Sequence, residues 1–317
     1  MILAMNSFIR RLTPVLAFAF SAIQLLAAQW SVQQGANPDS PGKMVLIERD
    51  KKPVARFVYG EGQMKPFLHI YGENGELITN GGLDSHGQPT GQFPHHRGIF
   101  IGWKINSELG NYDLWHMNNG GKMEVLNFEK LDTSDDSATI VVNVAWRAGK
   151  ADSTGNDLLL KEKRTLVISK PDGKYTQVDA SFHLVPVRDL NLAGDLQHSG
   201  VHFRAAAEVS NHEKETAYVT EPANVVKGGN LKWCHLEFPI GSRWYSATQL
   251  NAPSNPVEEL STRNYGRFGY FFKRSMKKDE ALDLKYRFFI QPLKSNGPGD
   301  PESARKEAEG QYASFAG

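Results

Sequence analysis

Apolar residues recur along this chain in short runs that are separated by turn-forming residues. The segments "KMVLIERD" and "KPVARFVYG" flank Asp50–Lys52, which predicts a β-hairpin with its tip at these residues. In "YTQVDASFHLVPV", Val178, Ala180, Phe182 and Leu184 alternate with polar residues, as in a strand with one buried face. About fifteen such strands at regular spacing predict an all-β fold, a large antiparallel β-sandwich.

Two further patterns concern a turn and the end of the chain. The segment "PFLHIYGENGELIT" has Asn74–Gly75 at its centre, a dipeptide typical of tight hairpins, and predicts two short strands around it. The final segment "DPESARKEAEGQYASF" offers Asp300 as an N-cap, Pro301 in the first turn and then a run of good helix formers. We therefore predict a short C-terminal helix that packs through Tyr312 and Phe315.

The N-terminus has the order of a secretory signal peptide. Two arginines precede an apolar stretch, Leu12–Leu26, and small residues follow it. We expect a signal peptide over residues 1–28, cleaved after Ala27 or Ala28, and a periplasmic or secreted location. Proline, serine and glutamine interrupt the stretch, which makes the alternative, an uncleaved anchor helix, less suitable. Residues 29–317 show no repeat of fixed period and no clear linker, which predicts a single β-sandwich domain.

Composition narrows the choice of function. The formal net charge is +1, so no broad electrostatic attraction to nucleic acid or an anionic membrane is expected. After the expected signal peptide, no apolar run is as long as the about 20 residues that a membrane-spanning helix needs. The one cysteine, Cys234, lies in the strand-like segment "LKWCHLEF", where we expect it to be buried. A single cysteine excludes thiolate zinc sites, iron–sulfur clusters and an internal disulfide.

The strongest candidate chemistry lies at the end of a polar loop, "NGGLDSHGQPTGQFPHHRG". In a regular strand the adjacent His95 and His96 would point to opposite faces, but Pro94 and Gly98 allow a bend that presents both. Two neighbouring imidazoles can divide acid and base roles or bind a divalent metal. Arg97 would hold an anionic or hydroxyl-rich substrate. The alternative is a loop end whose histidines bond the backbone.

A second cluster is "NYDLWHMNNGG". Asp113 and Trp115 share a face if the segment is extended, and His116 follows. An indole is a platform for the apolar face of a sugar ring, and a nearby carboxylate can bind hydroxyl groups. A core tryptophan with a polar rim is the alternative interpretation.

A third cluster is "GDLQHSGVHFRAAAEV". As a helix it would place His198 and His202 one turn apart, as two metal ligands would lie. Because Ser199 and Gly200 disfavour a helix, we expect a turn at Gly200 that leads into a strand. His202 and Arg204 then share one face of that strand, and His198 still reaches the same cleft.

These segments resemble a bacterial family often labelled PmoA-like, or "methane oxygenase PmoA". The likeness rests on "KPFLHIYGENGELITNGG", "FPHHRGIFIGW", "DLWH", "GVHFRAA", "STRNYGRFGYFF" and "LDLKYRFFI", and it spans about residues 45–292. The His-His-Arg-Gly segment is its most specific part. The resemblance implies an exported protein of carbohydrate catabolism, with a sandwich similar to that of sugar mutarotases and polysaccharide lyases.

The leading hypothesis is an exported carbohydrate-active enzyme with epimerase, lyase or glycoside hydrolase chemistry on a sugar. The predicted catalytic residues are His95, His96, Arg97 and His116; the predicted substrate-binding residues are Asp113, Trp115, His202 and Arg204; the candidate metal ligands are His95, His96 and His198. The cofactor is unknown, and a divalent metal is the candidate. One alternative is a non-catalytic carbohydrate-binding protein, which would show a row of exposed aromatic residues. The other, implied by the family label, is a metal-dependent oxygenase.

Overall fold

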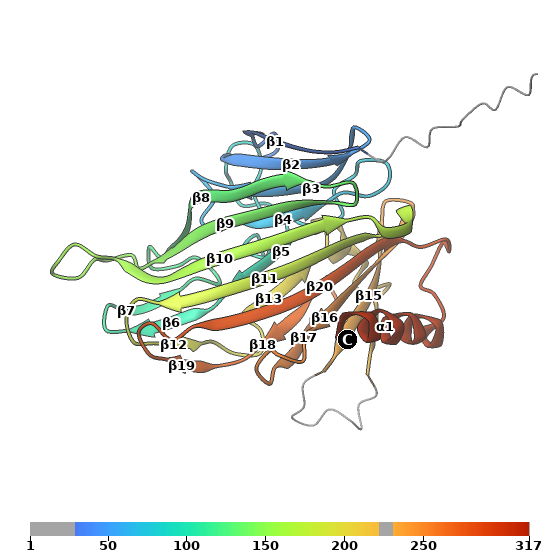
Figure 1. The fold of residues 1–317 in the computed structure, drawn as a ribbon. Coiled ribbons are helices and arrows are strands. Elements are labelled where there is room, and N and C mark those ends of the chain that lie inside the picture. The colour runs from blue at the N-terminus through green and yellow to red at the C-terminus, as the bar shows by residue number, and fades with distance from the viewer. Residues whose placement is uncertain (1–28, 222–230, 317) are drawn as a thin grey trace, which may run out of the picture.

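Antiparallel strands dominate the computed structural model, which describes residues 29–221 and 231–316 (Figure 1). The signal peptide predicted over residues 1–28 lies outside these described residues. The first sheet has eight strands, in the order β1 (Trp30–Ala36), β2 (Lys43–Arg49), β3 (Lys52–Tyr59), β4 (Phe67–Ile70), β5 (Ile99–Gly102), β13 (Gly200–Arg204), β18 (Arg267–Phe271) and β17 (Glu259–Arg263).

The second sheet also has eight strands and lies in front of the first in Figure 1. Its order is β14 (Ala217–Thr220), β15 (Trp233–Ile240), β16 (Arg243–Asn251), β20 (Leu282–Pro292), β11 (Thr176–Pro186), β10 (Leu158–Ser169), β9 (Ser137–Arg147) and β8 (Lys122–Thr133). A third sheet has four short strands, in the order β19 (Arg274–Met276), β12 (Leu190–Ala193), β6 (Lys104–Ser107) and β7 (Gly110–Asp113). The helical elements are η1 (Pro171–Gly173), η2 (Ala207–His212) and α1 (Pro301–Ala316).

One apolar core joins the facing sides of the two large sheets. Val178, Ala180, Phe182 and Leu184 on β11 are all buried in it, as the alternation predicts. Cys234 on β15 is a buried free cysteine in the same core, also as expected. These strands and their shared core confirm the predicted all-β antiparallel sandwich. Within the described residues no helix is long and apolar enough to cross a membrane.

The predicted turns are present. Asp50 and Lys51 have φ angles of 54° and 62° at the tip of the β2–β3 hairpin, where Arg49 pairs with Lys52. The turn at Gly75 also forms, with a φ angle of 82°. The chain after this turn does not form the predicted second strand and makes only isolated bridges, at Leu77 and Thr79 for example, because it soon turns away toward β13.

Helix α1 confirms the predicted C-terminal helix. Asp300 caps it, because its Oδ2 accepts hydrogen bonds from the Ser303 backbone N–H at 2.9 Å and from the Ser303 hydroxyl at 2.8 Å. The helix lies on the outer face of the second sheet (Figure 1), where Tyr312 and Phe315 pack beside a small apolar cluster.

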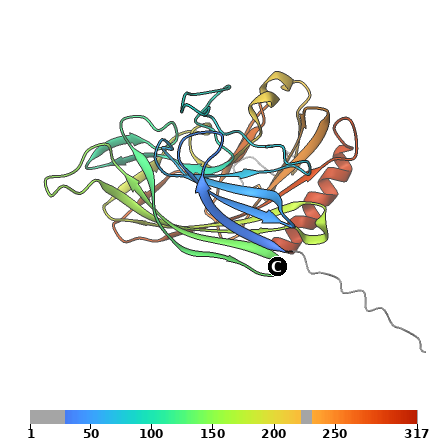
Figure 2. The same ribbon diagram turned by 90° about the horizontal axis from the view of Figure 1, so that it is seen from above.

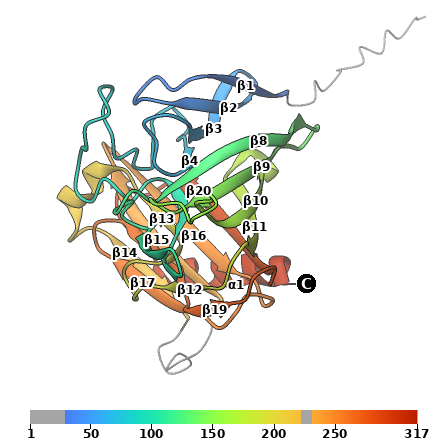
Figure 3. The same cartoon turned by 90° about the vertical axis from the view of Figure 1, so that its left-hand side faces the viewer.

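The outer face of the first sheet carries polar residues. On β13, Val201 and Phe203 point into the core, so His202 and Arg204 point to the opposite side. Loops cover this face, and Figure 2 shows these turquoise loops and the green strands of the second sheet on opposite sides of the blue strands. The loop between β4 and β5 projects from the sandwich (Figure 3) and comes close to η2 at Gly91.

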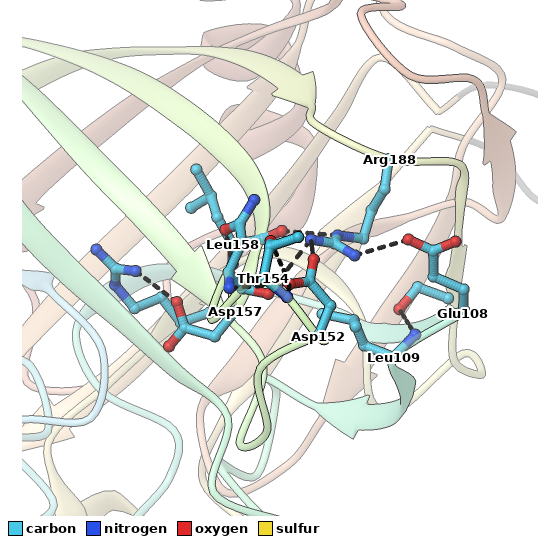
Figure 4. Close-up of polar contacts among 10 residues, drawn as sticks. Glu108, Leu109, Asp152, Thr154, Asp157, Leu158 and Arg188 are labelled. Carbon is cyan, nitrogen blue, oxygen red and sulfur yellow. Dashed lines mark hydrogen bonds and ion pairs between the residues drawn. The ribbon is translucent and has the colours of Figure 1, made fainter.

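A buried arginine fastens the third sheet to the second. Arg188 donates through Nη1 to Glu108 Oε1 at 2.7 Å, through Nη2 to Asp152 Oδ2 at 3.2 Å, and through Nε to the Leu158 carbonyl at 2.9 Å (Figure 4). Glu108 lies in the turn between β6 and β7, whereas Asp152 lies in the long loop between β9 and β10. One side chain therefore joins three segments that are distant in the sequence.

Replacing Arg188 with methionine is expected to lower the free energy of unfolding by about 2 kcal/mol, because a guanidinium that is only 7% exposed loses its hydrogen bonds to Glu108, Asp152 and the Leu158 carbonyl. Urea denaturation would measure the change. The exposed pair between Lys277 and Asp189 provides the control, since its side chains are 82% and 62% exposed. Lys277→Met should change the same free energy by less than about 0.5 kcal/mol. If Arg188→Met changed the free energy of unfolding as little as the control does, the structural role assigned to Arg188 would be wrong.

Candidate functional site

The His-His-Arg segment forms a turn at the end of the β4–β5 loop. The His96 backbone N–H donates to the Phe93 carbonyl at 3.0 Å, and Phe93 and Gly98 have φ angles of 56° and 51°. A Cβ atom on Gly98 would lie 2.2 Å from the Leu68 carbonyl oxygen, so only glycine fits there. The predicted bend is confirmed: the rings of His95 and His96 lie with their centroids 4.1 Å apart.

Imidazoles from two further loops continue this pair into a row. The ring of His116, from the β7–β8 loop, lies 4.4 Å from that of His95. The ring of His198, from the β12–β13 loop, lies 4.7 Å from that of His116. The row begins at the buried His96, passes His95 and ends at side chains that are 24% and 30% exposed. We call His96, His95, His116 and His198 the imidazole row.

His96 lies in an aromatic environment that leaves its ring nitrogens without partners. The side chain is 2% exposed, and among the described residues neither Nδ1 nor Nε2 has a hydrogen-bond partner. Its ring lies 5.4 Å from Trp115 and 6.1 Å from Tyr265, centroid to centroid. Asn80 Nδ2 donates to the His96 carbonyl at 2.6 Å and fixes the backbone. The ring is thus held by packing, and both nitrogens are buried, so a ligand reaches them only when the covering loop moves aside.

The two inner imidazoles of the row are uncharged bases. Burial, then the charge of Lys65 and the neighbouring His116 and His198, lower the pKa of His95 to about 3. Burial, then His95 and the charges of Arg267 and Lys65, hold the pKa of His96 well below its usual value. Both rings therefore stay neutral at physiological pH and can accept a proton.

Each outer imidazole is paired with a carboxylate. His116 Nδ1 lies 2.8 Å from Asp113 Oδ2, while Asp113 Oδ1 accepts the backbone N–H groups of Trp115 and His116. Burial opposes ionisation of Asp113, but these hydrogen bonds outweigh it and lower its pKa to about 2. His198 Nδ1 lies 2.8 Å from Asp195 Oδ1. Such pairing through Nδ1 fixes the orientation of each imidazole ring.

His202 forms part of the floor of the site. Its Nε2–H donates to the Ser199 carbonyl at 2.8 Å, and its Nδ1 accepts from Arg267 Nη1 at 3.0 Å. Arginine can only donate, so this pair of bonds requires the neutral Nε2–H tautomer. Gly269 leaves room for the ring, because a Cβ atom there would lie 2.5 Å from His202 Cγ. The side chain is fully buried, so His202 does not contact a ligand and instead supports the residues that line the site.

Two predicted substrate-binding or catalytic side chains also lie beneath the surface. Trp115 is 0% exposed, so a sugar ring does not reach its face in this structure. Arg97 is 7% exposed and uses Nε on the Pro94 carbonyl at 3.0 Å and Nη1 on Gln63 Oε1 at 2.7 Å. Both residues therefore support the imidazole row by packing and by holding the loop.

Lys65, Tyr265 and Arg267 belong to the site but were not predicted from the sequence. Lys65 Nζ donates to the Trp115 carbonyl at 2.6 Å, and burial, then the charge of Arg97, lower its pKa. Arg267 Nε donates to the Tyr265 hydroxyl at 3.2 Å. The sequence does contain a signal for Lys65 and Arg267, because each is the one charged residue beside an apolar run, in "KPFLHI" and "GRFGYFF". Burying a charge is costly, so a charged residue in such a run indicates a specific role.

The residues do not fit a bound metal. Across residues 29–221 and 231–316, no three or more His, Cys, Asp or Glu side chains lie close enough together to hold an ion. The candidate ligands His95, His96 and His198 lie along a row rather than around one point, and His198 is bonded to Asp195.

This chain is an all-β sandwich that carries a row of imidazoles over the outer face of its first sheet. The chain belongs to a family of unknown function, DUF6807, whose model matches residues 44–307. No curated protein sequence matches the chain. The resemblance to PmoA-like proteins stays a prediction.

Solved structures of low similarity share the fold class. A heparan sulfate lyase, HepC from Pedobacter heparinus, is 9% identical with a TM-score of 0.39, and the match covers 86% of this chain and 37% of the lyase. This chain thus spans little more than a third of that lyase. A GalM/aldose epimerase homologue from C. elegans is 9% identical with a TM-score of 0.32, and the match covers 84% of this chain and 100% of the homologue. Similarity at these TM-scores carries no information on substrate or reaction.

Proposed function

We propose that the protein is an exported carbohydrate-active enzyme that transfers a proton on a sugar by imidazole acid–base chemistry. The observation that carries this proposal is the imidazole row. Its buried end, His96, has two nitrogens without partners among the described residues, and its outer end is paired with Asp113. Neutral His95 and His96 serve as general bases that take the proton, and His116, oriented by Asp113, serves as the general acid that donates one.

The carboxylates favour epimerisation or elimination over hydrolysis. Glycoside hydrolysis in its usual form needs a protonated carboxylic acid beside an ionised one. Burial opposes ionisation of Asp113 and Asp195, but hydrogen bonds from His116 and His198 outweigh it and lower both pKa values. Neither carboxyl group therefore stores a proton at neutral pH. A neutral imidazole can instead take a proton from a sugar carbon, the common first step of epimerases and lyases.

An exposed aromatic ring beside the row supports a sugar substrate. Phe93 is 39% exposed, and its ring lies 6.2 Å from that of His95 and 5.6 Å from that of His96, centroid to centroid. Its left-handed backbone is costly for a phenylalanine and is typical of functional loops. Phe93 takes the stacking role first given to Trp115. It is the one exposed aromatic among the described residues, so they lack the row expected of a carbohydrate-binding protein.

Turnover in D₂O tests the reaction class. A panel of neutral and acidic oligosaccharides and glycosides is incubated with the mature chain, and NMR follows deuterium at the sugar carbons. We expect deuterium to enter recovered substrate or product with wild type, and to be lost with His95→Ala. His183→Ala is the control, because this histidine is 47% exposed and pairs with Asp283 on the second sheet. Turnover without deuterium at carbon, or no turnover across the panel, would overturn the proposal.

A further inference from the structure

Four buried basic side chains surround the imidazole row without a carboxylate partner. Lys65, Arg204 and Arg267 are 0% exposed and Arg97 is 7% exposed. Among residues 29–221 and 231–316, no carboxylate lies within 4.0 Å of any of the four. A buried charge is normally paired, because removing it from water is costly. The proposed proton transfer does not require four buried basic side chains without carboxylate partners. Their presence beside the row therefore needs another explanation.

Arg204 has the least satisfied guanidinium of the three arginines. Its Nη2 makes one long hydrogen bond, 3.4 Å to the Gln92 carbonyl oxygen. Its Cζ lies 4.7 Å from the ring centroid of Tyr265. Its buried Nε and Nη1 have no partner among the described residues, and the same holds for Nε1 of Trp115. All three of these groups are donors and none can accept.

A ligand group that only accepts hydrogen bonds matches this excess of donors. Carboxylates and sulfate esters have several acceptor oxygens, carry negative charge and suit the planar fork of arginine. A sugar hydroxyl matches less well, because it brings a donor as well as acceptors and carries no charge. We propose that the substrate is an acidic sugar whose carboxylate or sulfate binds at Arg204; this inference rests on the proposed function.

The anion would bind close to the proposed base. Tyr265 contacts both groups: Arg204 packs on its ring, and the His96 ring lies 6.1 Å away at an angle of 8°. Phe93 packs on Tyr265 at 4.7 Å, and Gln92 covers Arg204 through its carbonyl. Because Arg204 is fully buried, a ligand reaches it only when this part of the β4–β5 loop moves aside.

Calorimetric titration with matched sugars tests the inference. The probes are methyl glucuronide, glucose 6-sulfate and neutral methyl glucoside, each titrated into the mature wild-type chain, Arg204→Met and Arg274→Met. Arg274 is the control because it is 38% exposed and pairs with Glu280. We expect at least one acidic probe to bind at least about tenfold more tightly than the neutral one, and Arg204→Met alone to remove that preference. The preferred probe tells carboxylate from sulfate.

Thermal unfolding of the same variants separates binding from folding. Because an unpaired buried cation destabilises the free protein, Arg204→Met should not lower the melting temperature. A large decrease, together with binding of acidic probes by the residual folded protein, would assign Arg204 a structural role and overturn the inference. Equal binding or turnover of neutral and acidic sugars would overturn the inference but leave the proposed proton transfer intact. Failure of every sugar to bind or react would overturn both.

Discussion

Replacing His96 with leucine is expected to lower kcat on the sugar substrate by about 10²–10⁴-fold, the usual contribution of a general base. The folded protein should remain as stable as wild type or become more stable. Leucine keeps apolar contact with Phe100, Trp115 and Tyr265, and it removes two buried nitrogens that have no partner among the described residues. A catalytic role for His96 predicts a lower kcat with unchanged or higher stability of the protein. A structural role predicts that the replacement lowers the stability of the protein.

Steady-state kinetics and urea denaturation of His96→Leu measure the two quantities. His183→Leu is the matched control, an exposed histidine on β11 that should leave both kcat and the free energy of unfolding unchanged. His95→Leu is a second test, since its ring lies 4.1 Å from that of His96 in the same row. Retention of kcat within a few-fold in both row variants would contradict the assignment of the bases.

The pH dependence of kcat/KM gives an independent readout. Burial and the charge of Lys65 hold the pKa of His95 at about 3, and burial also holds that of His96 well below 6.5. The charged and titratable groups facing His95 are Lys65, His116, His198 and Asp113, of which only the carboxylate favours its protonation. Those facing His96 are His95, Arg267, Lys65 and His202, and all of them disfavour its protonation. Both bases therefore stay unprotonated as the pH falls, and activity should persist well below pH 6.5. An acid limb close to pH 6.5 would show that neither inner imidazole is the base.

Alternation along the strands allowed much of the sandwich to be predicted, because one face of each strand meets the apolar core. The third sheet could not be predicted, since its strands are three or four residues long and partly polar. The apolar segment "GIFIGWKI" divides between β5 and β6 rather than forming one strand. A Cβ atom on Gly102 would lie 2.8 Å from the Leu114 carbonyl, and the buried Trp103 donates to the Phe272 carbonyl at 2.9 Å. These long-range contacts turn the chain.

The three candidate clusters could be found from residue types, but their arrangement required the fold. Proline and glycine around His95 and His96 indicated the bend, and the structure confirms it. No local pattern indicates that His116 and His198 complete the row, because their loops meet only after β7 and β12 pair with β6. Trp115 was interpreted as a surface platform from its polar neighbours, yet the loops bury it against the sheet.

Acidification is expected to lower the free energy of unfolding of this protein progressively below about pH 6.5. His69, His96 and His202 are 3%, 2% and 0% exposed, and burial holds the pKa of each well below 6.5 in the folded state. In the unfolded chain each regains a pKa of about 6.5. The unfolded state therefore binds more protons below that pH, and stability that is complete above pH 6.5 is lost as the pH falls. Each histidine should cost about 1.4 kcal/mol per pH unit.

The variant His202→Gln tests one histidine of the three. Glutamine keeps a donor for the Ser199 carbonyl and an acceptor for Arg267 but takes up no proton, so it preserves the two bonds of the neutral tautomer. Urea denaturation between pH 4.5 and 8 should show a shallower loss of stability than wild type, by about 1.4 kcal/mol per pH unit. His183→Gln should follow wild type. Equal slopes for His202→Gln and wild type would show that His202 takes up a proton as readily in the folded protein as in the unfolded chain. That result would contradict the neutral tautomer inferred from the hydrogen bond from Arg267.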